Sequence, residues 1–301
     1  MPEQTTISDP LSRIRVAPTM SQRVVRAFRS SIPAMLSLAF LILVIALAVA
    51  APLIDRYGPT HSDLRYFEQA PSAKHWLGTD SSGFDIWSRL LWGARTSLFV
   101  AAASALISIG IGTFVGALSG FYRGVLDSVL MRITDGFIAF PDIVLVLMLA
   151  SILGPSRRNV IIVIGVLSWT GTARLIRGQF LVLRELDWVL AARSIGVSNR
   201  RLIFRHMLPH VVTQIAVTSA FIAAAAVLTE AGLSYLGLGV QPPQPSWGSM
   251  LSNAQSVHIL RDVPWSWLAP GVTLTLSVVA VSYVGETLRR ALDPRGERSL
   301  H

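Results

Sequence analysis

Long runs without a charged residue alternate with short arginine-rich segments along this chain. Such runs cover residues 30–54, 96–122, 143–156, 159–173, 207–229 and 263–285. A helix needs about 20 largely apolar residues to cross a membrane. The runs 30–54, 96–122, 207–229 and 263–285 are long enough alone. The run 143–156 reaches this length if the helix starts near residue 127, and the run 159–173 continues as an amphipathic helix through Leu183. The pattern predicts an all-α integral membrane protein with six transmembrane helices.

Composition agrees with membrane insertion. The 301 residues are 52% hydrophobic and 14% charged, with a mean hydropathy of +0.55, whereas soluble domains carry about 25% charged residues. The net charge of +9 does not indicate nucleic-acid binding, because the arginines cluster at the ends of the apolar runs. There is no cysteine, which excludes disulfides and cysteine-based metal sites.

The distribution of arginine predicts how the spans are oriented. Five arginines lie in residues 1–29, seven in residues 174–205, and four after residue 288. Six spans with both termini in the cytoplasm place all three segments there, as the positive-inside rule requires. The segments about 55–95 and about 240–262 are then external. The Arg157-Arg158 pair also falls outside, which departs from the rule.

The first apolar run is predicted to be a retained span and not a cleaved signal peptide. It has 25 uncharged residues and follows a 29-residue polar arm, whereas a signal peptide has a short basic head and an apolar core of about 7–15 residues. We therefore divide the chain into a flexible cytoplasmic arm (1–31), a six-span domain (32–295) and a cytoplasmic tail (296–301).

The segment AARSIGVSNRRLIFRHMLP, which ends at Pro209, separates the fourth and fifth apolar runs. Residues 187–195 have the composition of a short helix with an acidic start, and Gly196 suits its end. Residues 199–208 predict a second, amphipathic helix, and Pro209 suits the first turn of the following span. Such a basic segment can dock a partner protein or anchor the loop to anionic lipid. The residues alone leave both alternatives open.

This segment resembles the EAA loop of ABC-importer permeases, whose pattern is Glu-Ala-Ala-x-x-x-Gly followed by a Leu-Pro-like ending. Ala191, Ala192, Gly196 and Pro209 match, whereas Leu190 replaces the glutamate. In that family the loop, about 184–209 here, forms a coupling helix that sits in a groove of the ATPase subunit. The positions to which the resemblance assigns ATPase coupling are Asp187, Ala191, Ala192, Arg193, Gly196, Arg200, Arg201 and Pro209.

Further segments narrow the resemblance to C-type permeases of the dipeptide/oligopeptide class. HWLGTDSSGFDIWSRLLWGARTSL, residues 75–98, is similar to their external signature, except that Phe84 replaces an arginine. Its matching positions are Gly78, Asp80, Asp85 and Arg95. The segments IAFPDIVLVLMLASILGPSRRNVI, ARLIRGQFLVLRE, LTEAGLSYLGLGVQPPQPSWGSML and ETLRRALDPR match in order, so the resemblance covers roughly residues 70–295.

Polar residues and glycines within the predicted spans are further candidates. The acidic residues are Asp135, Asp142 and Glu230. Ionisable groups are costly in lipid and are candidates for a functional site; we favour the alternative, that they pair with hydroxyl or backbone groups near the interface. A GxxxGxxxG face on the second span is formed by Gly112, Gly116 and Gly120. It permits close helix contact, within this chain or with a partner chain.

Catalytic motifs are missing from the sequence. It contains no GxxxxGK[ST] for nucleotide binding, no HExxH and no GxSxG. The histidines show no metal-ligand spacing. We therefore expect no enzyme activity, no cofactor and no metal site in this chain.

The resemblance implies a non-catalytic permease subunit of an ATP-driven importer in the bacterial inner membrane, which forms half of a path for di- and oligopeptides. The implied partners are a second homologous permease, two ATP-binding subunits that hold ATP and Mg, an external solute-binding protein and membrane lipid. Members of this class also import nickel complexes, glutathione, opines or sugars, so another solute is an alternative. A self-contained secondary transporter is a further alternative, but no internal repeat of the kind expected for one is visible.

Overall fold

Each apolar run of the sequence folds into helix. The computed structural model describes residues 19–292, so the predicted tail 296–301 and the first 18 residues of the predicted arm lie outside the described residues. The α-helices are α1 (Met20–Arg29), α2 (Ile32–Ile54), α3 (Ile86–Tyr122), α4 (Gly124–Ile138), α5 (Asp142–Leu153), α6 (Arg157–Leu167), α7 (Thr170–Leu183), α8 (Asp187–Ser194), α9 (Asn199–Arg201), α10 (Leu208–Tyr235), α11 (Trp247–Ser252), α12 (Val257–Asp262) and α13 (Trp265–Leu292).

The helices that are long and apolar enough to cross a membrane agree with the predicted spans. They are Ile32–Ile54, Ile86–Tyr122, Arg157–Leu183, Asn199–Tyr235 and Trp265–Leu292. The remaining predicted span is broken, because α4 and α5 meet at a bend of 85°. Pro141 precedes α5 at this break, and proline disfavours helical backbone in the residue before it. The described residues thus give five spans, or six if the bent pair counts as one.

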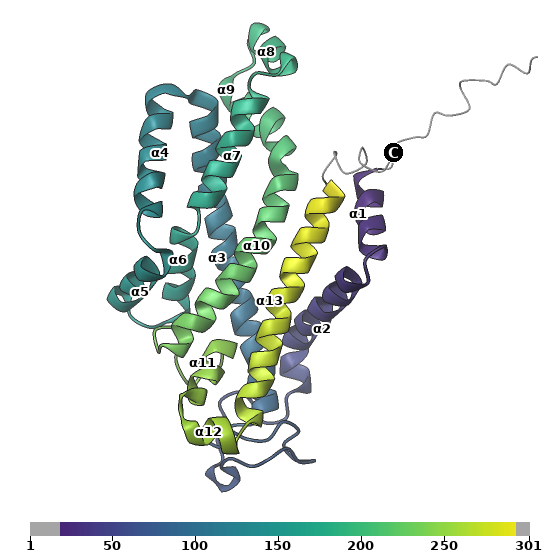
Figure 1. Ribbon diagram of the computed structural model, residues 1–301, viewed down its shortest axis with the longest axis vertical. Coiled ribbons are helices and arrows are strands. Elements are labelled where there is room, and N and C mark those ends of the chain that lie inside the picture. Colours follow the sequence, from purple (N-terminus) through teal and green to yellow (C-terminus); the bar gives the residue numbers. More distant parts are fainter. Residues whose placement is uncertain (1–18, 293–301) are drawn as a thin grey trace, which may run out of the picture.

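Two of these segments are longer than the membrane core is thick. The helix α3 and the segment Asn199–Tyr235 have 37 residues each, roughly 55 Å at 1.5 Å per residue, against a hydrocarbon core of about 30 Å. They pack against each other along the long axis of the molecule (Figure 1). We call the end of the molecule that carries α8 the α8 end, and the opposite end, which carries α11 and α12, the α12 end.

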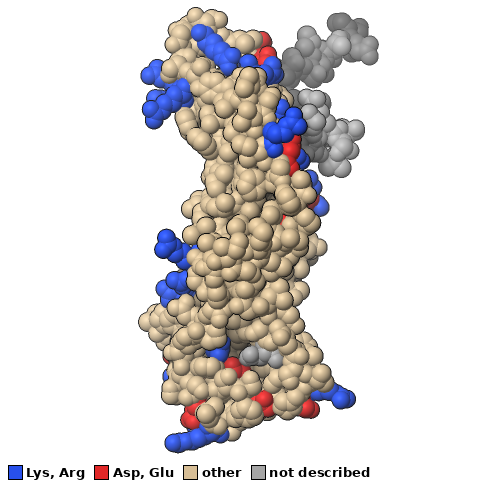
Figure 2. Space-filling view, turned by 90° about the vertical axis from the view of Figure 1, so that its left-hand side faces the viewer, with Lys and Arg blue, Asp and Glu red and all other residues tan. Residues whose placement is uncertain are grey.

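Charged side chains gather toward the two ends of the molecule. Figure 2 shows basic side chains around both ends and a mid-section whose visible surface is mainly uncharged, apart from basic side chains that project at its left edge. The helix α2 illustrates the composition of this band, since its 23 residues carry no charge. This distribution is typical of a protein whose mid-section lies in lipid.

The helix α3 begins earlier than the uncharged run at 96–122. It starts at Ile86, inside the segment predicted to be external, because the Asp85 side chain accepts the Ser88 backbone N–H at 2.8 Å and caps the helix. The charge of Arg89 in the first turn is balanced by Asp80, whose carboxylate lies 3.4 Å away. The helix α3 therefore begins within the predicted external segment, whose limit near residue 95 stays a prediction.

The second helix predicted for the loop before Pro209 is not separate from the following span. Residues 199–207 form α9 and a π-helical turn, η3 (Leu202–Met207), which continue directly into α10. The Leu208 N–H donates to the Ile203 carbonyl, five residues back. Pro209 has no N–H, and its ring conflicts with an α-helical carbonyl in the preceding turn. The wider π turn accommodates the proline without breaking the helix.

The described part of the predicted arm is helical. In α1 the backbone N–H of Thr19 donates to the Gln22 side-chain oxygen at 3.0 Å, one half of a capping box. The helix α1 packs against α13. This finding differs from the expectation of a flexible arm over residues 1–31.

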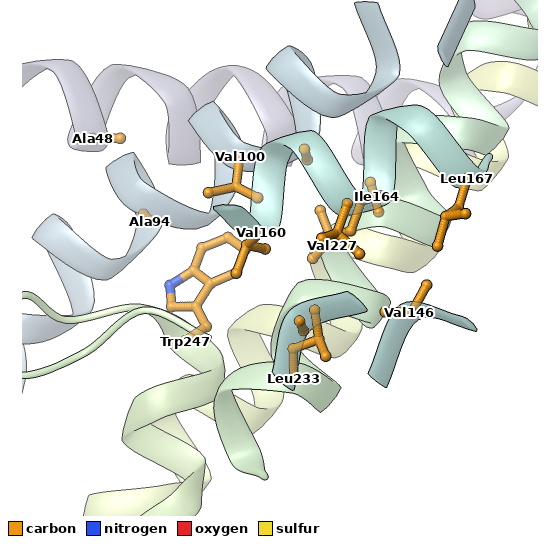
Figure 3. Close-up of a cluster of buried hydrophobic side chains, with 14 of the residues drawn as sticks. Ala48, Ala94, Val100, Val146, Val160, Ile164, Leu167, Val227, Leu233 and Trp247 are labelled. Carbon is orange, nitrogen blue, oxygen red and sulfur yellow. The ribbon is translucent and has the colours of Figure 1, made fainter. Parts of the chain in front are cut away.

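Two clusters of buried apolar side chains hold the helices together. The larger cluster surrounds Trp247, which is completely buried between α3, α6 and α10 (Figure 3). Its indole N–H donates to the Leu90 carbonyl at 3.4 Å. The smaller cluster, near the α8 end, consists of Ala117, Phe121, Ile176, Phe180, Val189, Leu202, Ile203, Met207 and Val211. One buried residue of α8 therefore belongs to the core.

The predicted glycine face of α3 is used within this chain. A Cβ atom at Gly116 would lie 2.4 Å from the Ala173 carbonyl oxygen, and one at Gly112 or Gly120 would lie 2.5 or 2.6 Å from a Cβ atom of α7. Side chains larger than hydrogen are excluded at these distances. The face brings α3 and α7 into direct backbone contact, which resolves the alternative left open by the sequence.

Glu230 joins three segments at the α12 end. It is completely buried on α10. The Ser97 hydroxyl donates to one carboxylate oxygen at 2.9 Å and the Ser234 hydroxyl to the other at 2.7 Å. The Ser97 oxygen also accepts the backbone N–H of Trp247 at 3.2 Å. These bonds provide the partners that a buried carboxylate requires, which matches the pairing with hydroxyl groups that we favoured.

The glycine contact predicts a position-specific loss of stability. We expect Gly116→Ala to lower the free energy of unfolding by about 1–3 kcal/mol, because α3 and α7 must separate to admit the methyl group. Gly110→Ala on the same helix is the matched control, since its Cβ would meet nothing within 4 Å. Thermal unfolding of the purified protein in detergent measures both variants. Equal destabilisation by the two would contradict this account of the packing.

The Glu230 network predicts a second effect on stability. We expect Glu230→Leu to destabilise the protein by about 1–3 kcal/mol, because it leaves buried hydroxyl groups without their partner, and Glu230→Gln to have a smaller effect. Thr229→Val is the control, since the Thr229 hydroxyl bonds only the Ala225 carbonyl of its own helix. Unfolding in detergent is the measurement. An unchanged stability of Glu230→Leu together with lost transport would assign Glu230 to the transport path instead.

Candidate functional site

The helix α8 protrudes at one end of the molecule (Figure 1). The turn that ends it depends on Gly196, whose φ of +82° is in the left-handed region. The Gly196 N–H donates to the Arg193 carbonyl at 2.9 Å and the Val197 N–H to the Ala192 carbonyl at 3.1 Å. A Cβ atom at Gly196 would meet nothing within 4 Å. The backbone conformation, and not the available space, therefore favours glycine here.

One side of α8 is buried and the other is open. Val189 is completely buried and belongs to the smaller cluster, together with Phe121, Phe180 and Met207. The opposite side exposes apolar residues, and 82% of Ile195 is accessible to solvent. Exposed apolar side chains on a protruding helix are typical of a surface that contacts another protein.

The structure brings most predicted coupling residues together at this end. Asp187 is the first residue of α8, and Ala191, Gly196, Arg200 and Arg201 are exposed on α8, its terminal turn and α9. Pro209 is exposed in the first turn of α10. Ala192 is half-buried against the smaller cluster. Leu190, which replaces the glutamate of the EAA pattern, is 45% exposed.

Arg193 is the one predicted coupling residue that turns inward. Its guanidinium carbon lies 4.8 Å from the centre of the Phe121 ring, so it stacks on the end of α3. A second arginine, Arg184, donates to the Phe121 carbonyl at 2.6 Å. These contacts fix α8 and the turn before it to the end of α3.

Sequence reasoning missed the contact between Trp188 and His210. The two rings are 5.1 Å apart and connect α8 directly to the first turn of α10. A tryptophan in the middle of a basic loop was the available signal. Because Arg193 of α8 also contacts Phe121 of α3, a displacement of α8 reaches two long helices at once.

Three residues of the predicted external signature form a scaffold before α3. Gly78 has φ +76°, and a Cβ there would lie 2.5 Å from the Gln69 carbonyl oxygen. Asp85 bonds the His75 ring nitrogen Nδ1 at 2.8 Å. Asp80 accepts two backbone N–H groups of the loop at 2.9 and 3.0 Å. Burial raises the pKa of the Asp80 carboxyl above its ordinary value, and attraction to Arg89 offsets this only in part.

The departure at Phe84 has a structural counterpart. The Phe84 ring lies 4.4 Å from the Arg89 guanidinium carbon, within the distance of a cation–π contact. The fourth signature residue, Arg95, is not part of this scaffold. It is exposed on α3, 5.4 Å from the centre of the Trp92 ring, and lines a hollow at the α12 end.

The acidic candidates near the bent span lie on its surface. Asp135 pairs with Arg174 of α7 at 2.6 Å, and both side chains are about half exposed. Asp142 is exposed in the first turn of α5, where a carboxylate suits the helix N-terminus. The sequence did not single out Asp127, which accepts two bonds from Arg177 at 2.6 and 2.7 Å. Such a bidentate pair ties α4 to α7.

The described residues 19–292 contain no group of three or more His, Asp or Glu side chains that could hold a metal ion. The charged contacts found in this part are ion pairs between helices, within helices and within loops. The two candidate sites are therefore the α8 end, as a contact surface, and the hollow at the α12 end.

Comparison with known proteins provides independent information. The family model "binding-protein-dependent transport system inner membrane component" matches residues 110–298, and a model of the N-terminal transmembrane domain of oligopeptide transport permease C matches residues 19–71. A Brucella suis protein provisionally named as a peptide permease is 43% identical over 82% of both chains. A glutathione transport system permease protein of Pectobacterium atrosepticum is 40% identical over 85% of both chains.

The match at residues 110–298 covers all of α8, α9 and α10, whereas the first part of α3, which lines the hollow, lies between the two matched regions. The relatives align with most of their own length, so the similarity is not confined to one motif. The chain therefore belongs to the family of binding-protein-dependent transport system inner membrane components.

Proposed function

We propose that this chain is the permease subunit of an ATP-driven importer of short peptides. Relatives are named for the transport of peptides or of glutathione, which is itself a short peptide. These names support a peptide over the metal complexes, opines or sugars that the sequence left open. The chain would form half of the translocation path and would leave ATP hydrolysis to partner subunits.

The observation that carries this proposal is the construction of the α8 end. The short helix α8 and the turn that ends it expose apolar side chains, and α9 exposes arginines beside them. The inner side of α8 contacts α3 through Arg193 and α10 through Trp188, and its Val189 is buried in the smaller cluster. A helix that only anchored the loop to lipid would not need direct contacts with two spans. The geometry suits a surface that receives force from another protein and passes it into the membrane.

The partners follow from this role. Two ATP-binding subunits that hold ATP and Mg would dock on α8, one on each permease, and a second permease of similar fold would complete the path. An external binding protein would deliver the solute at the α12 end. We place the α8 end in the cytoplasm of a bacterial inner membrane, with both termini on that side, because it carries Arg200, Arg201 and the basic helix α1.

Movement of the ATP-binding subunits would displace α8 and tilt the attached spans. The π turn η3 is the place where the backbone bonds between α9 and α10 are irregular, and π turns of this kind are often found at functional positions in helices. Transport further requires that the solute and the ATP-binding subunits prefer different states of the spans.

Coupling to a motor predicts a measurable response of ATP hydrolysis. We expect this chain to copurify with the products of neighbouring genes as a complex whose ATPase rate increases when binding protein and a peptide mixture are added together. Binding protein without peptide is the control. A complex whose rate ignores peptides would contradict the peptide substrate, and the absence of any complex would contradict the docking role of α8.

The Gly196 turn predicts loss of coupling after one substitution. Gly196→Pro fixes φ near −65° in place of +82° and removes the bond to the Arg193 carbonyl, at a cost of about 3 kcal/mol in the local turn. We expect the variant to insert and bind its partners but to lose most peptide-stimulated ATPase activity. Ser198→Pro is the matched control, because Ser198 already has a φ of −63°. Full uptake by the inserted Gly196→Pro protein would overturn this role.

A further inference from the structure

A hollow of about 500 Å³ opens at the α12 end where four segments meet. The first half of α3 contributes Trp92, Arg95 and Phe99, the start of α6 contributes Arg157, and the loop before α11 contributes Gln244. The loop after α2 closes the remaining side. Its lining thus combines two cations, two aromatic rings and an amide from parts of the chain that are far apart in sequence.

Both guanidinium groups are held against aromatic rings. The Arg95 guanidinium carbon lies 5.4 Å from the centre of the Trp92 ring, and that of Arg157 lies 5.5 Å from the centre of the Phe99 ring. The Trp92 indole is itself fixed, because its N–H donates to Asp55 at 2.8 Å. The cations are therefore oriented by contacts that leave their N–H donors available.

The positive charge of the hollow is not neutralised by ion pairs. Over residues 19–292, neither Arg95 nor Arg157 forms a salt bridge with a carboxylate. The Asp55 carboxylate accepts hydrogen bonds from the Trp92 indole and the Ser88 hydroxyl and pairs with neither arginine. The donors of the two arginines are thus free to bind an anion.

Two physical rules disfavour Arg157 where it stands. It is the first residue of α6 and Arg158 is the second, and cations at a helix N-terminus oppose the helix dipole. With the orientation proposed above, the pair also lies on the external side, against the positive-inside rule. A bound anion would explain an arginine at this position, because the helix N-terminus and the guanidinium would then attract the same ligand.

We propose that the hollow binds the free carboxylate of a small solute, and that in the importer this is the C-terminal carboxylate of the transported peptide. This inference rests on the proposed function. Arginine donors suit a carboxylate, and the aromatic rings suit the apolar side chain beside it. The volume lies within the range of pockets for small ligands, about 300–1,000 Å³, and the concave shape fits a small molecule better than the surface of a protein.

A thiol introduced in the wall tests this site directly, because the native chain has no cysteine. Thr60 lines the hollow and is exposed. In the Thr60→Cys protein, assembled with its partners in nanodiscs of zwitterionic lipid, the labelling rate of this chain is measured with an anionic and a cationic methanethiosulfonate. Two nearby arginines should favour the anionic reagent by about fivefold at physiological salt.

Protection by ligand is the decisive measurement. We expect millimolar Ala-Phe to slow labelling severalfold, and Ala-Phe amide, which lacks the carboxylate, to leave the rate unchanged. Arg95→Gln and Arg157→Gln should abolish the protection. Arg158→Gln is the matched control, because it removes the same charge from the adjacent position, which does not line the hollow, and it should retain the protection.

Three outcomes would overturn the proposal. The first is equal protection by Ala-Phe amide. The second is protection by binding protein without peptide, which would make the hollow a protein-docking surface. The third is protection by anionic lipid added to the nanodisc in place of protection by peptide. Labelling requires neither transport nor ATP hydrolysis. If peptide does not stimulate ATP hydrolysis but the carboxylate still protects the thiol, the importer function is rejected and the site is kept. If peptide stimulates ATP hydrolysis but gives no protection, only the site is rejected.

Discussion

The close contact between α3 and α7 determines where everything else in the molecule can lie. Without side chains at Gly112, Gly116 and Gly120, the two backbones meet directly. The helix α7 leads within a few residues into α8, while α3 ends at Phe121, on which Arg184 and Arg193 are fixed. The base of α8 is consequently positioned by a helix contact in the membrane and not by the loop itself. These contacts give the short protruding helix α8 a defined orientation.

The opposite end is organised by polar contacts, for a physical reason. Loops there must satisfy their backbone groups near the membrane surface, and apolar packing alone cannot do this. Glu230 collects hydroxyl groups of α3 and α10, and through Ser97 it reaches the backbone of Trp247. The indole of Trp247 then fills the space between α3, α6 and α10. The carboxylate that sequence reasoning considered for transport is thus explained by its role in closing this end.

How far the sequence predicts the structure depends on whether a signal is local. Spans and the glycine face were predicted because apolar length and a four-residue period are local properties. The uncharged run at 96–122 did not reveal that α3 begins at Ile86, because Arg89 and Arg95 interrupt the apolar pattern and the pairing of Arg89 with Asp80 is not visible in the sequence. The continuous α9–α10 segment was missed because Pro209 normally marks a helix start, and a π turn leaves no sequence signature. For the candidate sites, the resemblance located α8. The hollow combines single residues from distant segments, of which the sequence had singled out Arg95 and Arg157 but could not bring them together.

A single helix carries parts of both candidate sites. The helix α3 holds Arg95 near one end and Phe121 at the other, and contacts with α7 and α10 run along its length. If docking at α8 shifts α3 relative to its neighbours, the hollow changes shape, and the affinity for its ligand changes by some factor. Thermodynamic linkage requires that ligand in the hollow then change the affinity of docking at α8 by the same factor. If the proposed binding site and docking helix both act as proposed, α3 alone would let the solute influence the ATP-binding subunits without an additional signalling segment.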